Sequence, residues 1–400
     1  MWWKAFNLAC LLFAGCAAAI SQEDLGRLYA EAQAAQNAGD LATAARKYEA
    51  IVRLRPDMAE AHSNLGNLYY QQGDAARAGA AYRKAIQLKP QLAGPHFFLG
   101  VIAFNQHDYA AALSHLSRAS RLDSRNALIS SYLGYTQYAR GSYAEAAAAL
   151  ENAAEIEGRN IDVLYMLGKS YGHLAGEAYT LLQKKFPEAA YTYLARAHFF
   201  EAEQNWKSAA EQYSMALEKL PGNARLREKQ AEMAARSPAK PEIANPARSD
   251  DLVDGSLAYL YAPPAGPRIA QEIAVRRARI GSLKPAGPDP DRRLYLTAES
   301  YQIISYHARL QVFEIDPQSY RAHQIRAQLL ETSGKDEEAV AEYRRALELK
   351  PDLQNVHFAI GSLYWKDRRL EEARVELEEE LRLNPNHPQA LYELGDILTG

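Results

Sequence analysis

Histidine and cysteine are the residue types that most often bind metals or act as acid–base groups, and the chain holds ten histidines and two cysteines. His198 and Glu201 are three residues apart, which would place both side chains on one face of a helix, where they could share a metal ion. No second pair with ligand spacing accompanies them, so the sequence does not predict a metal site. Cys10 and Cys16 both lie near the N-terminus, which leaves the rest of the chain without thiol chemistry.

Motifs of the common enzyme classes are missing from the sequence. It contains no Gly-rich phosphate loop, no Gly-x-Ser-x-Gly turn and no His-Glu-x-x-His helix. Lys and Arg number 46 against 49 Asp and Glu, a net charge of −3, which argues against bulk attraction to nucleic acid or to an anionic membrane. The sequence therefore predicts a protein that is not an enzyme, with no cofactor and no nucleic-acid partner.

A period of about 34 residues, within the range that marks stacked structural repeats, organises most of the chain. In residues 59–92, two stretches carry apolar residues at helical spacing, Gly73 and Asp74 separate them, and Pro90 ends the second. The pattern recurs in residues 25–58, 93–126 and 127–160, with Gly39, Ala44, Tyr48 and Pro56, then Gly100, Ala112 and Ala119, then Gly134, Gly141, Ala146 and Ala153 in register. One such hairpin cannot bury its apolar face, so the copies must stack. Gly66 and Ala78 mark the predicted closest approach of the two helices in residues 59–92.

The repeating unit resembles the tetratricopeptide repeat (TPR), a helix–turn–helix unit of about 34 residues with Leu-Gly and tyrosine in its first helix, alanine–aromatic–alanine in its second, and a closing proline. Ser124 and Gly158 depart from it by standing where proline is usual. The resemblance implies an all-α fold, a right-handed superhelix or α-solenoid of stacked hairpins. Places within a repeat are counted from its first residue, and each repeat is called a window. The resemblance also implies that the four histidines at the fourth place of their windows are packing residues: His62, His96, His323 and His357.

The fifth repeat is shortened, and it occurs twice. Pro187 arrives five residues early, as if the turn between the helices were deleted, which predicts one long helix over residues 161–186. A regular repeat follows over residues 190–223. The same two repeats return further along the chain at one constant offset, without a gap: Leu164, Tyr165, Ser170, Tyr171, Pro187, Ala209, Tyr213, Ala216 and Pro221 match Leu294, Tyr295, Ser300, Tyr301, Pro317, Ala339, Tyr343, Ala346 and Pro351.

A proline-rich insert separates the two copies, because residues 237–291 hold nine of the eighteen prolines. Within it, Arg276, Arg277 and Arg279 predict a short basic helix, which is explained better as a solvated surface than as a docking element. The predicted divisions are a signal peptide (1–21), a first TPR block of about six repeats (22–236), the insert (237–293), and a second block that ends in a half repeat (294–400).

The N-terminus has the form of an export signal, with one lysine, a short apolar run and small residues up to Ser21. Two places, Ala17–Ala19 and Ala19–Ser21, fit cleavage by ordinary signal peptidase. Residues 13–16 also resemble a bacterial lipobox, which would make Cys16 a lipidation site; an uncleaved first helix is the third alternative. No later stretch is long and apolar enough to predict a membrane span. We expect an exported protein, periplasmic or associated with the outer membrane.

The first helices of a TPR superhelix line its concave side, and the resemblance implies that places five, nine and twelve of each window point inward. The candidate groove residues at these places are Asn67, Tyr70, Phe97, Val101, Phe104, Tyr135, Tyr138, Tyr165 and Lys169. Aromatic side chains give contact area at low entropic cost, which suits binding of a peptide or protein segment. The alternative is that these side chains pack on one another in a tight superhelix. Inward lysines and arginines typical of TPR co-chaperones that hold a chaperone's C-terminal carboxylate are missing, which speaks against that partner.

The last predicted helix carries Leu391, Leu394 and Leu398 at helical spacing with no second helix to cover them. This predicts self-association or partner docking at the C-terminal end. Together, these features predict a protein–protein interaction scaffold in an exported or envelope assembly. The alternative is a regulatory or substrate-recruiting subunit of an envelope enzyme complex.

Overall fold

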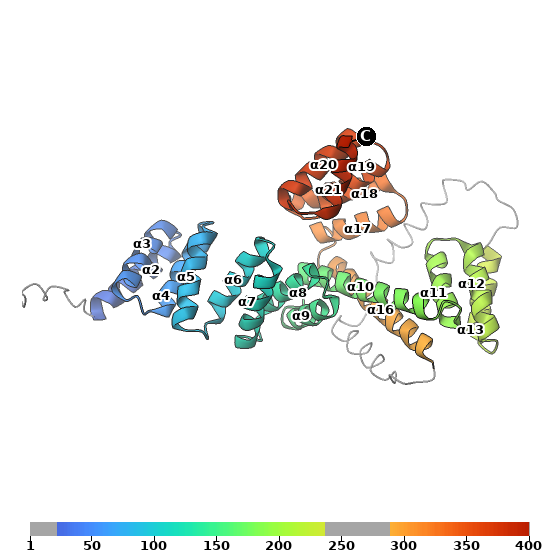
Figure 1. Ribbon diagram of the computed structural model, residues 1–400, viewed down its shortest axis with the longest axis horizontal. Helices are drawn as coiled ribbons and strands as arrows, with labels where there is room; N and C mark the ends of the chain where they lie inside the picture. The colour runs from blue at the N-terminus through green and yellow to red at the C-terminus, as the bar shows by residue number, and fades with distance from the viewer. Residues whose placement is uncertain (1–21, 237–288, 400) are drawn as a thin grey trace, which may run out of the picture. The chain divides into compact units, whose positions relative to one another are not determined.

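The computed structural model describes residues 22–236 and 289–399, and these residues form 18 helices and no strand (Figure 1). The expected all-α helix–turn–helix architecture is confirmed. The described helices divide into two compact units, with the boundary after Gly141. These units do not follow the block boundaries expected from the insert, so the predicted domain division stays a prediction.

Unit 1 consists of consecutive hairpins and a final single helix. Its elements are α2 (Gln22–Asn37), α3 (Leu41–Leu54), α4 (Ala59–Gln71), α5 (Ala75–Leu88), α6 (Ala93–Asn105), α7 (Tyr109–Leu122) and α8 (Ala127–Ala139). The turns follow from the sequence: Gly39 and Gly73 have positive φ, and the aspartates after them, Asp40 and Asp74, accept a hydrogen bond from the backbone N–H three residues on. His107 takes the same left-handed place at φ 59°, as its register predicts.

In the hairpins α4–α5 and α6–α7, the glycine at place eight meets the side chain sixteen residues later. A Cβ atom on Gly66 would lie 2.6 Å from the Tyr82 ring, and one on Gly100 would lie 2.6 Å from Leu116. Tyr82 and Leu116 are fully buried. The predicted closest approach at Gly66 is therefore present, and alanine at place twenty, such as Ala78, is fully buried beside it.

Unit 2 begins with α9 (Tyr143–Ile156) and contains two long helices of similar length, α10 (Ile161–Lys185) and α16 (Pro290–Ile315). The long helix expected over 161–186 is confirmed, and α16 begins at Pro290, inside the insert predicted from the sequence. The other helices of unit 2 are α11 (Ala190–Ala202), α12 (Trp206–Lys219), α13 (Ala224–Arg236), α17 (Tyr320–Thr332), α18 (Asp336–Leu349), α19 (Val356–Lys366), α20 (Leu370–Leu383) and α21 (Pro388–Thr399).

The long helices α10 and α16 pack side by side and antiparallel (Figure 1). Gly168 in the first half of α10 meets Ser305 and Arg309 in the second half of α16, while Tyr179 in the second half of α10 bonds Glu299 in the first half of α16. The shortened repeat lacks five residues at its turn. When these five are counted in, Arg309 stands at the place of its repeat that Tyr82 and Leu116 take in theirs. Each shortened repeat therefore finds its missing second helix in the other copy.

The α10–α16 pair has a local twofold relation, in which each residue of one copy corresponds to its match in the other. Tyr171 and Tyr301 correspond to each other, and their rings are in contact with centroids 5.5 Å apart. The bond that Gln328 donates to the Tyr165 hydroxyl, 3.0 Å, corresponds to the 3.4 Å contact between His198 and the Tyr295 hydroxyl. The repeated sequence thus folds as an internal pseudo-dimer around these two helices.

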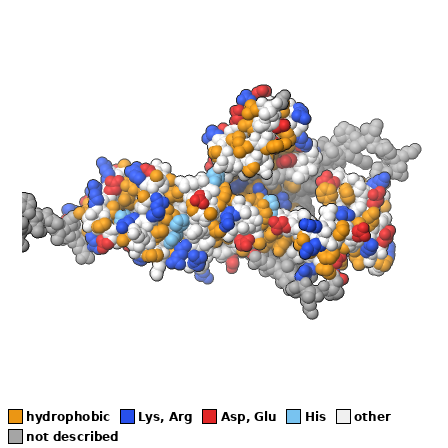
Figure 2. All heavy atoms as spheres, viewed as in Figure 1, with side chains coloured by type: hydrophobic (Ala, Val, Ile, Leu, Met, Phe, Trp, Pro, Cys, Tyr) orange, Lys and Arg blue, Asp and Glu red, His pale blue; other side chains and the backbone are white. Residues whose placement is uncertain are grey.

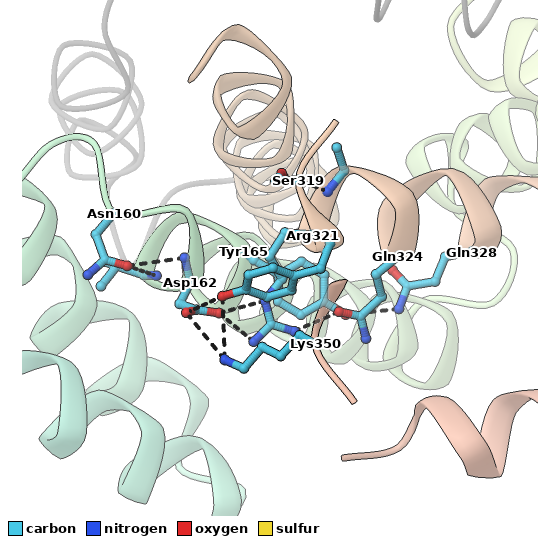
Figure 3. A network of polar contacts seen from close by, with 11 residues as sticks. Asn160, Asp162, Tyr165, Ser319, Arg321, Gln324, Gln328 and Lys350 are labelled. Carbon is cyan, nitrogen blue, oxygen red and sulfur yellow. Dashed lines mark hydrogen bonds and ion pairs between the residues drawn. The ribbon is translucent and has the colours of Figure 1, made fainter. Parts of the chain in front are cut away.

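One carboxylate ties the start of α10 to α17 and to the end of α18 (Figure 3). Asp162 accepts hydrogen bonds from the Tyr320 hydroxyl at 2.6 Å and from Arg321 at 2.7 Å, and the Lys350 ammonium lies 3.9 Å away. Burial alone would raise the pKa of Asp162, but the charge of Arg321, the bond from Tyr320 and the charge of Lys350 outweigh it and hold that pKa below its usual range.

We expect Gly66→Ala to destabilise unit 1 by about 1–3 kcal/mol, because the added methyl group overlaps the buried Tyr82 ring. The matched control is Gly26→Ala in α2, where a Cβ atom meets nothing within 4 Å. Alanine favours a helix over glycine by about 1 kcal/mol, so the control should keep or raise Tm in thermal unfolding. Equal Tm values for the two variants would contradict this account of the hairpin.

We expect Asp162→Asn to lower the free energy of unfolding by about 1–3 kcal/mol at neutral pH, because Arg321 and Lys350 lose their partner. A depressed folded-state pKa gives stability that is present above the unfolded value, about 3.9, and is lost as the pH falls through the folded value. The difference between wild type and variant should therefore shrink towards zero in strong acid. Denaturant titrations of wild type and variant, at neutral pH and in strong acid, measure this difference.

Glu371→Gln is the control for the Asp162 variant, since Glu371 pairs with Arg374 at 3.1 Å on the exposed surface of α20. It should leave unfolding unchanged at either pH. If the gap for Asp162→Asn does not depend on pH, the carboxylate charge is not what holds α17 to α10.

Candidate functional site

Aromatic rings on the first helices of unit 1 form a chain of contacts. Phe98 lies 5.2 Å from Tyr70 and 5.1 Å from Phe97 between ring centroids. Tyr132 lies 5.7 Å from Phe97, 5.8 Å from Phe104 and 5.9 Å from Tyr135. The rings therefore connect α4, α6 and α8, as expected for inward places of consecutive first helices.

Phe98 and Tyr132 were missed as site residues by sequence reasoning, although they link the others. Both stand at place six of their windows, next to the inward place five. The signal was an aromatic residue at the same place of two consecutive repeats. Phe98 also stacks on the buried Tyr82 ring at 5.3 Å, so this place joins the hairpin core to the inner face.

The candidate residues of unit 1 differ in exposure. Phe97 and Val101 are buried, at 8% and 2%, in a core cluster with Leu116. Tyr70, Phe104, Tyr135 and Tyr138 are partly exposed. Asn67 accepts a 2.9 Å hydrogen bond from the Tyr82 hydroxyl, which fixes its side chain on the hairpin. The inward residues of unit 1 therefore fall into two groups. Phe97 and Val101 are packing residues, and the rings of Tyr70, Phe104, Tyr135 and Tyr138 present surface.

Tyr165 and Lys169 belong to unit 2, on α10. Tyr165 is 2% exposed, because α17 covers it: the Arg321 guanidinium lies 4.4 Å from the ring centroid and Gln328 donates a hydrogen bond to the hydroxyl (Figure 3). Burial raises the pKa of Tyr165. The Lys169 ammonium lies 5.9 Å from the same ring, and burial, with the neighbouring charge of Arg321, lowers the pKa of Lys169. A peptide-binding groove lined by all nine candidate residues stays a prediction.

Of the histidines at place four, His323 and His357 bond across their hairpins to carboxylates. His323 lies 2.7 Å from Glu342, and His357 lies 2.7 Å from Glu376, so each histidine meets a carboxylate of the following helix. The rings of His62 and His96 lie 3.1 Å and 3.3 Å from the carbonyl oxygens of the prolines six residues before them. These side chains join helices, as packing residues do, and add polar contacts that the register alone did not indicate.

His198 and Glu201 do not converge on one point. His198 lies 3.3 Å from Glu299, while Glu201 accepts hydrogen bonds from Tyr213 and Lys229, both at 2.7 Å. Within residues 22–236 and 289–399, no group of three or more His, Cys, Asp or Glu side chains could hold a metal ion. Glu331 and Tyr343 repeat the Glu201–Tyr213 bond at 2.8 Å in the second copy, which marks it as part of the hairpin architecture.

Other sequence predictions fall at the ends of the chain and in the insert. Cys16, the leader and Arg276–Arg279 lie outside the described residues. No helix in the part of the chain that the structure describes is long and apolar enough to cross a membrane. Leu391 and Leu398 are 49% and 69% exposed on α21, while Leu394 is half-buried. Self-association through this helix stays a prediction.

The face of the described helices that Figure 2 draws mixes both signs of charge. Figure 2 shows Lys and Arg interspersed with Asp and Glu over the visible face, with hydrophobic side chains scattered between them. Such a surface carries no broad field of one sign, in keeping with the net charge of −3.

Comparison with known proteins finds repeat families and repeat structures. A family model described as a tetratricopeptide repeat matches residues 29–93, 99–160 and 358–399, and one described as a TPR repeat matches residues 332–367. The comparison with curated proteins finds no match.

Among solved structures, the chain is similar to a crystal structure of MamA, with 21% identity over 50% of this chain and 96% of that one, at a TM-score of 0.33. It is also similar to YrrB, described as a TPR protein with an unusual peptide-binding site, with 17% identity over 51% of this chain and 90% of that one, at 0.35. PilF of Pseudomonas aeruginosa is 19% identical over 52% of this chain and 98% of its own, also at 0.35.

The family matches lie in both halves of the sequence, over just under half of its residues, and coincide with helix–turn–helix hairpins of the structure. With its stacked helix–turn–helix units, the chain belongs to the tetratricopeptide repeat family, whose members serve as protein-interaction scaffolds.

Proposed function

We propose that the chain is an exported scaffold that holds an extended or helical segment of a partner protein on the aromatic face of unit 1. The aromatic face comprises the partly exposed rings of Tyr70, Phe98, Phe104, Tyr132, Tyr135 and Tyr138. The single observation that carries the proposal is the continuity of these rings over three consecutive first helices, through the contacts of Phe98 and Tyr132.

Each hairpin closes without these rings, although Tyr70, Phe98, Phe104 and Tyr132 also pack with one side against the core clusters of unit 1. Closure is supplied by fully buried residues such as Tyr82 and Leu116 against their glycines. Tyrosine and phenylalanine side chains that remain partly exposed after closure offer flat apolar area with few rotatable bonds, and tyrosine adds a hydroxyl for hydrogen bonding. A peptide segment fits such a face, because it presents apolar side chains and backbone polar groups together along its length.

Export is supported by the leader alone. Residues 1–21 combine one lysine, an apolar run and small residues near the expected cleavage points. In this proposal the mature scaffold acts in the periplasm or at the outer membrane, either free or held by lipid on Cys16.

We expect Phe104→Ala combined with Tyr138→Ala to weaken peptide binding by about thirtyfold or more, since central aromatics carry about 2 kcal/mol or more each when truncated. The probe is a synthetic peptide obtained by selecting a displayed library against the wild-type protein, and fluorescence anisotropy measures its Kd. Tm should fall little, because both side chains are partly exposed.

The matched control removes the same two kinds of ring elsewhere, by Phe199→Ala with Tyr392→Ala, at positions 61% and 70% exposed in unit 2. It should leave the Kd unchanged. The proposal fails if the control weakens binding as much as the test pair, or if the test pair unfolds the protein, which would make these rings packing residues.

We expect the natively expressed protein to lack its leader and to begin between Cys16 and Gln22, because the run of small residues there suits a signal peptidase. Intact-mass spectrometry of protein purified from its own host gives the new N-terminus. A diacyl or triacyl increment on Cys16 identifies a lipoprotein, and a mass that still includes residues 1–15 rules out cleaved export.

A further inference from the structure

A cavity of about 650 Å³ opens between α10 and α16 in unit 2, on one side of the local twofold. Its lining includes the cations Lys169, Lys184 and Arg309, and the single carboxylate of Glu177. It also includes the polar side chains of Ser305 and Gln328. The lining is thus predominantly positive, in a chain whose net charge is negative.

Arg309 occupies a place that regular hairpins fill with a core side chain. Gly66 meets Tyr82 and Gly361 meets Leu377, but Gly168 meets Arg309, whose side-chain carbon would lie 3.0 Å from an added Cβ atom. The guanidinium is held over the cavity by Ser305, with 3.2 Å to its hydroxyl and 3.4 Å to its carbonyl oxygen. Burial lowers the pKa of Arg309 and that of Lys169.

The other side of the twofold carries different side chains at the matching places. Lys169 and Arg309 correspond there to Glu299 and Tyr179, which bond each other at 2.5 Å, and His198 lies 3.3 Å from the same carboxylate. Lys184 corresponds to Glu314. On that side Tyr179, Glu299 and His198 contact one another, and carboxylates stand where the cavity has Lys169 and Lys184.

Glycines account for the open space. Gly172 and Gly176 line the cavity, and they correspond to Gln302 and Tyr306 in the other copy. A Cβ atom on Gly176 meets nothing within 4 Å, so the backbone there does not require glycine. Glycine inside a helix costs about 1 kcal/mol relative to alanine, and here it leaves room beside Lys169 and Arg309.

The cavity is elongated along α10. Its lining runs from Gly168 to Lys184, a rise of about 24 Å at 1.5 Å per residue. An extended peptide of about seven residues has that length, at roughly 3.3–3.6 Å per residue. A single inorganic ion would leave most of this length unfilled.

We propose that the α10–α16 cavity binds an acidic peptide segment of a partner protein, with a side-chain carboxylate placed at Lys169 and Arg309. A carboxylate there meets two cations held in a partly desolvated site, together with the hydrogen-bonding groups of Ser305 and Gln328. The segment continues along α10 past Gly176 towards Lys184. This site is separate in chemistry and position from the aromatic face of unit 1.

The probe is a fluorescein-labelled heptaglutamate with capped ends, and anisotropy with the full chain measures its Kd. Lys169→Met, which keeps the volume and removes the charge, should weaken binding about tenfold or more. Gly176→Tyr should do the same by filling the cavity with the residue that the other copy carries; its Cβ atom meets nothing within 4 Å, and tyrosine favours a helix more than glycine does. Lys185→Met, on the exposed end of α10, is the matched control and should bind as wild type does.

Thermal unfolding of each variant separates loss of binding from loss of fold. Three results overturn the proposal: no binding of heptaglutamate, equal weakening by Lys185→Met and Lys169→Met, or unchanged binding to folded Gly176→Tyr. Displacement of the probe by citrate or phosphate at concentrations equal to those of unlabelled heptaglutamate also overturns it, because the cavity then recognises a small anion and no chain. The aromatic-face variants play no part in this test, so the two proposals stand or fall separately.

Discussion

The close approach of α10 and α16 at Gly168 is the contact on which unit 2 depends. Ser305 donates a buried 2.7 Å hydrogen bond to the Gly168 carbonyl oxygen, and any side chain at this glycine would press on the Ser305 carbonyl oxygen and on Arg309. The turn that normally folds a repeat back on itself is missing from both helices. A helix of this length exposes an apolar face along both halves, and burying that face requires another helix of the same length. The second copy of the shortened repeat provides it.

This exchange explains why the two shortened repeats occur as a pair. In a regular repeat, the second helix packs on the first helix of the same hairpin. In a single shortened repeat the two are one continuous helix, so its second half would have nothing to pack on, and stacked repeats are stable only through such neighbours. With two copies, Tyr179 reaches Glu299 and Gly168 reaches Arg309 across the twofold. The regular hairpins α11–α12 and α17–α18 then follow from equivalent ends of the two long helices, with the Glu201–Tyr213 and Glu331–Tyr343 bonds repeated in each.

The sequence was sufficient for the local structure and insufficient for this pairing. The repeat period located the turns at Gly39 and Gly73, the contact of Gly66 with the following helix, and the long helix implied by the early Pro187. A period describes what each residue does within its own hairpin. It did not indicate that Gly168 would meet a residue of the other copy, because the deletion shows only that the local partner is lost. The second copy, which repeats the first without a gap, was the available signal. It did not indicate that the two long helices would pack antiparallel, and only this packing brings Gly168 to Arg309.

The candidate site was predictable to a similar depth. Register placed Tyr70, Phe104, Tyr135 and Tyr138 on one side of their helices, and they lie partly exposed there. Register also placed Phe97, Val101 and Tyr165 inward, yet these three are buried. Exposure depends on what lies opposite: Tyr132 against Phe97, Leu116 in the cluster around Val101, and Arg321 with Gln328 over Tyr165. Such neighbours are set by the rotation between successive hairpins, which a pattern within one repeat does not contain.

The two halves of the pseudo-dimer share one backbone arrangement but place different polar and charged side chains in it. A polar group placed among packed helices must find a partner or remain near water, since burying it alone costs several kcal/mol for a charge. Glu299 meets this requirement through the Tyr179 hydroxyl and His198. Arg309 stands where regular hairpins have an apolar or aromatic core residue, with Lys169 lining the same space. Glycines at 172 and 176 line the same cavity and leave room beside these two cations. A cation in a core place and an open space beside it therefore belong together, because the open space spares the cation full burial, and the binding proposal for the α10–α16 cavity rests on this pairing.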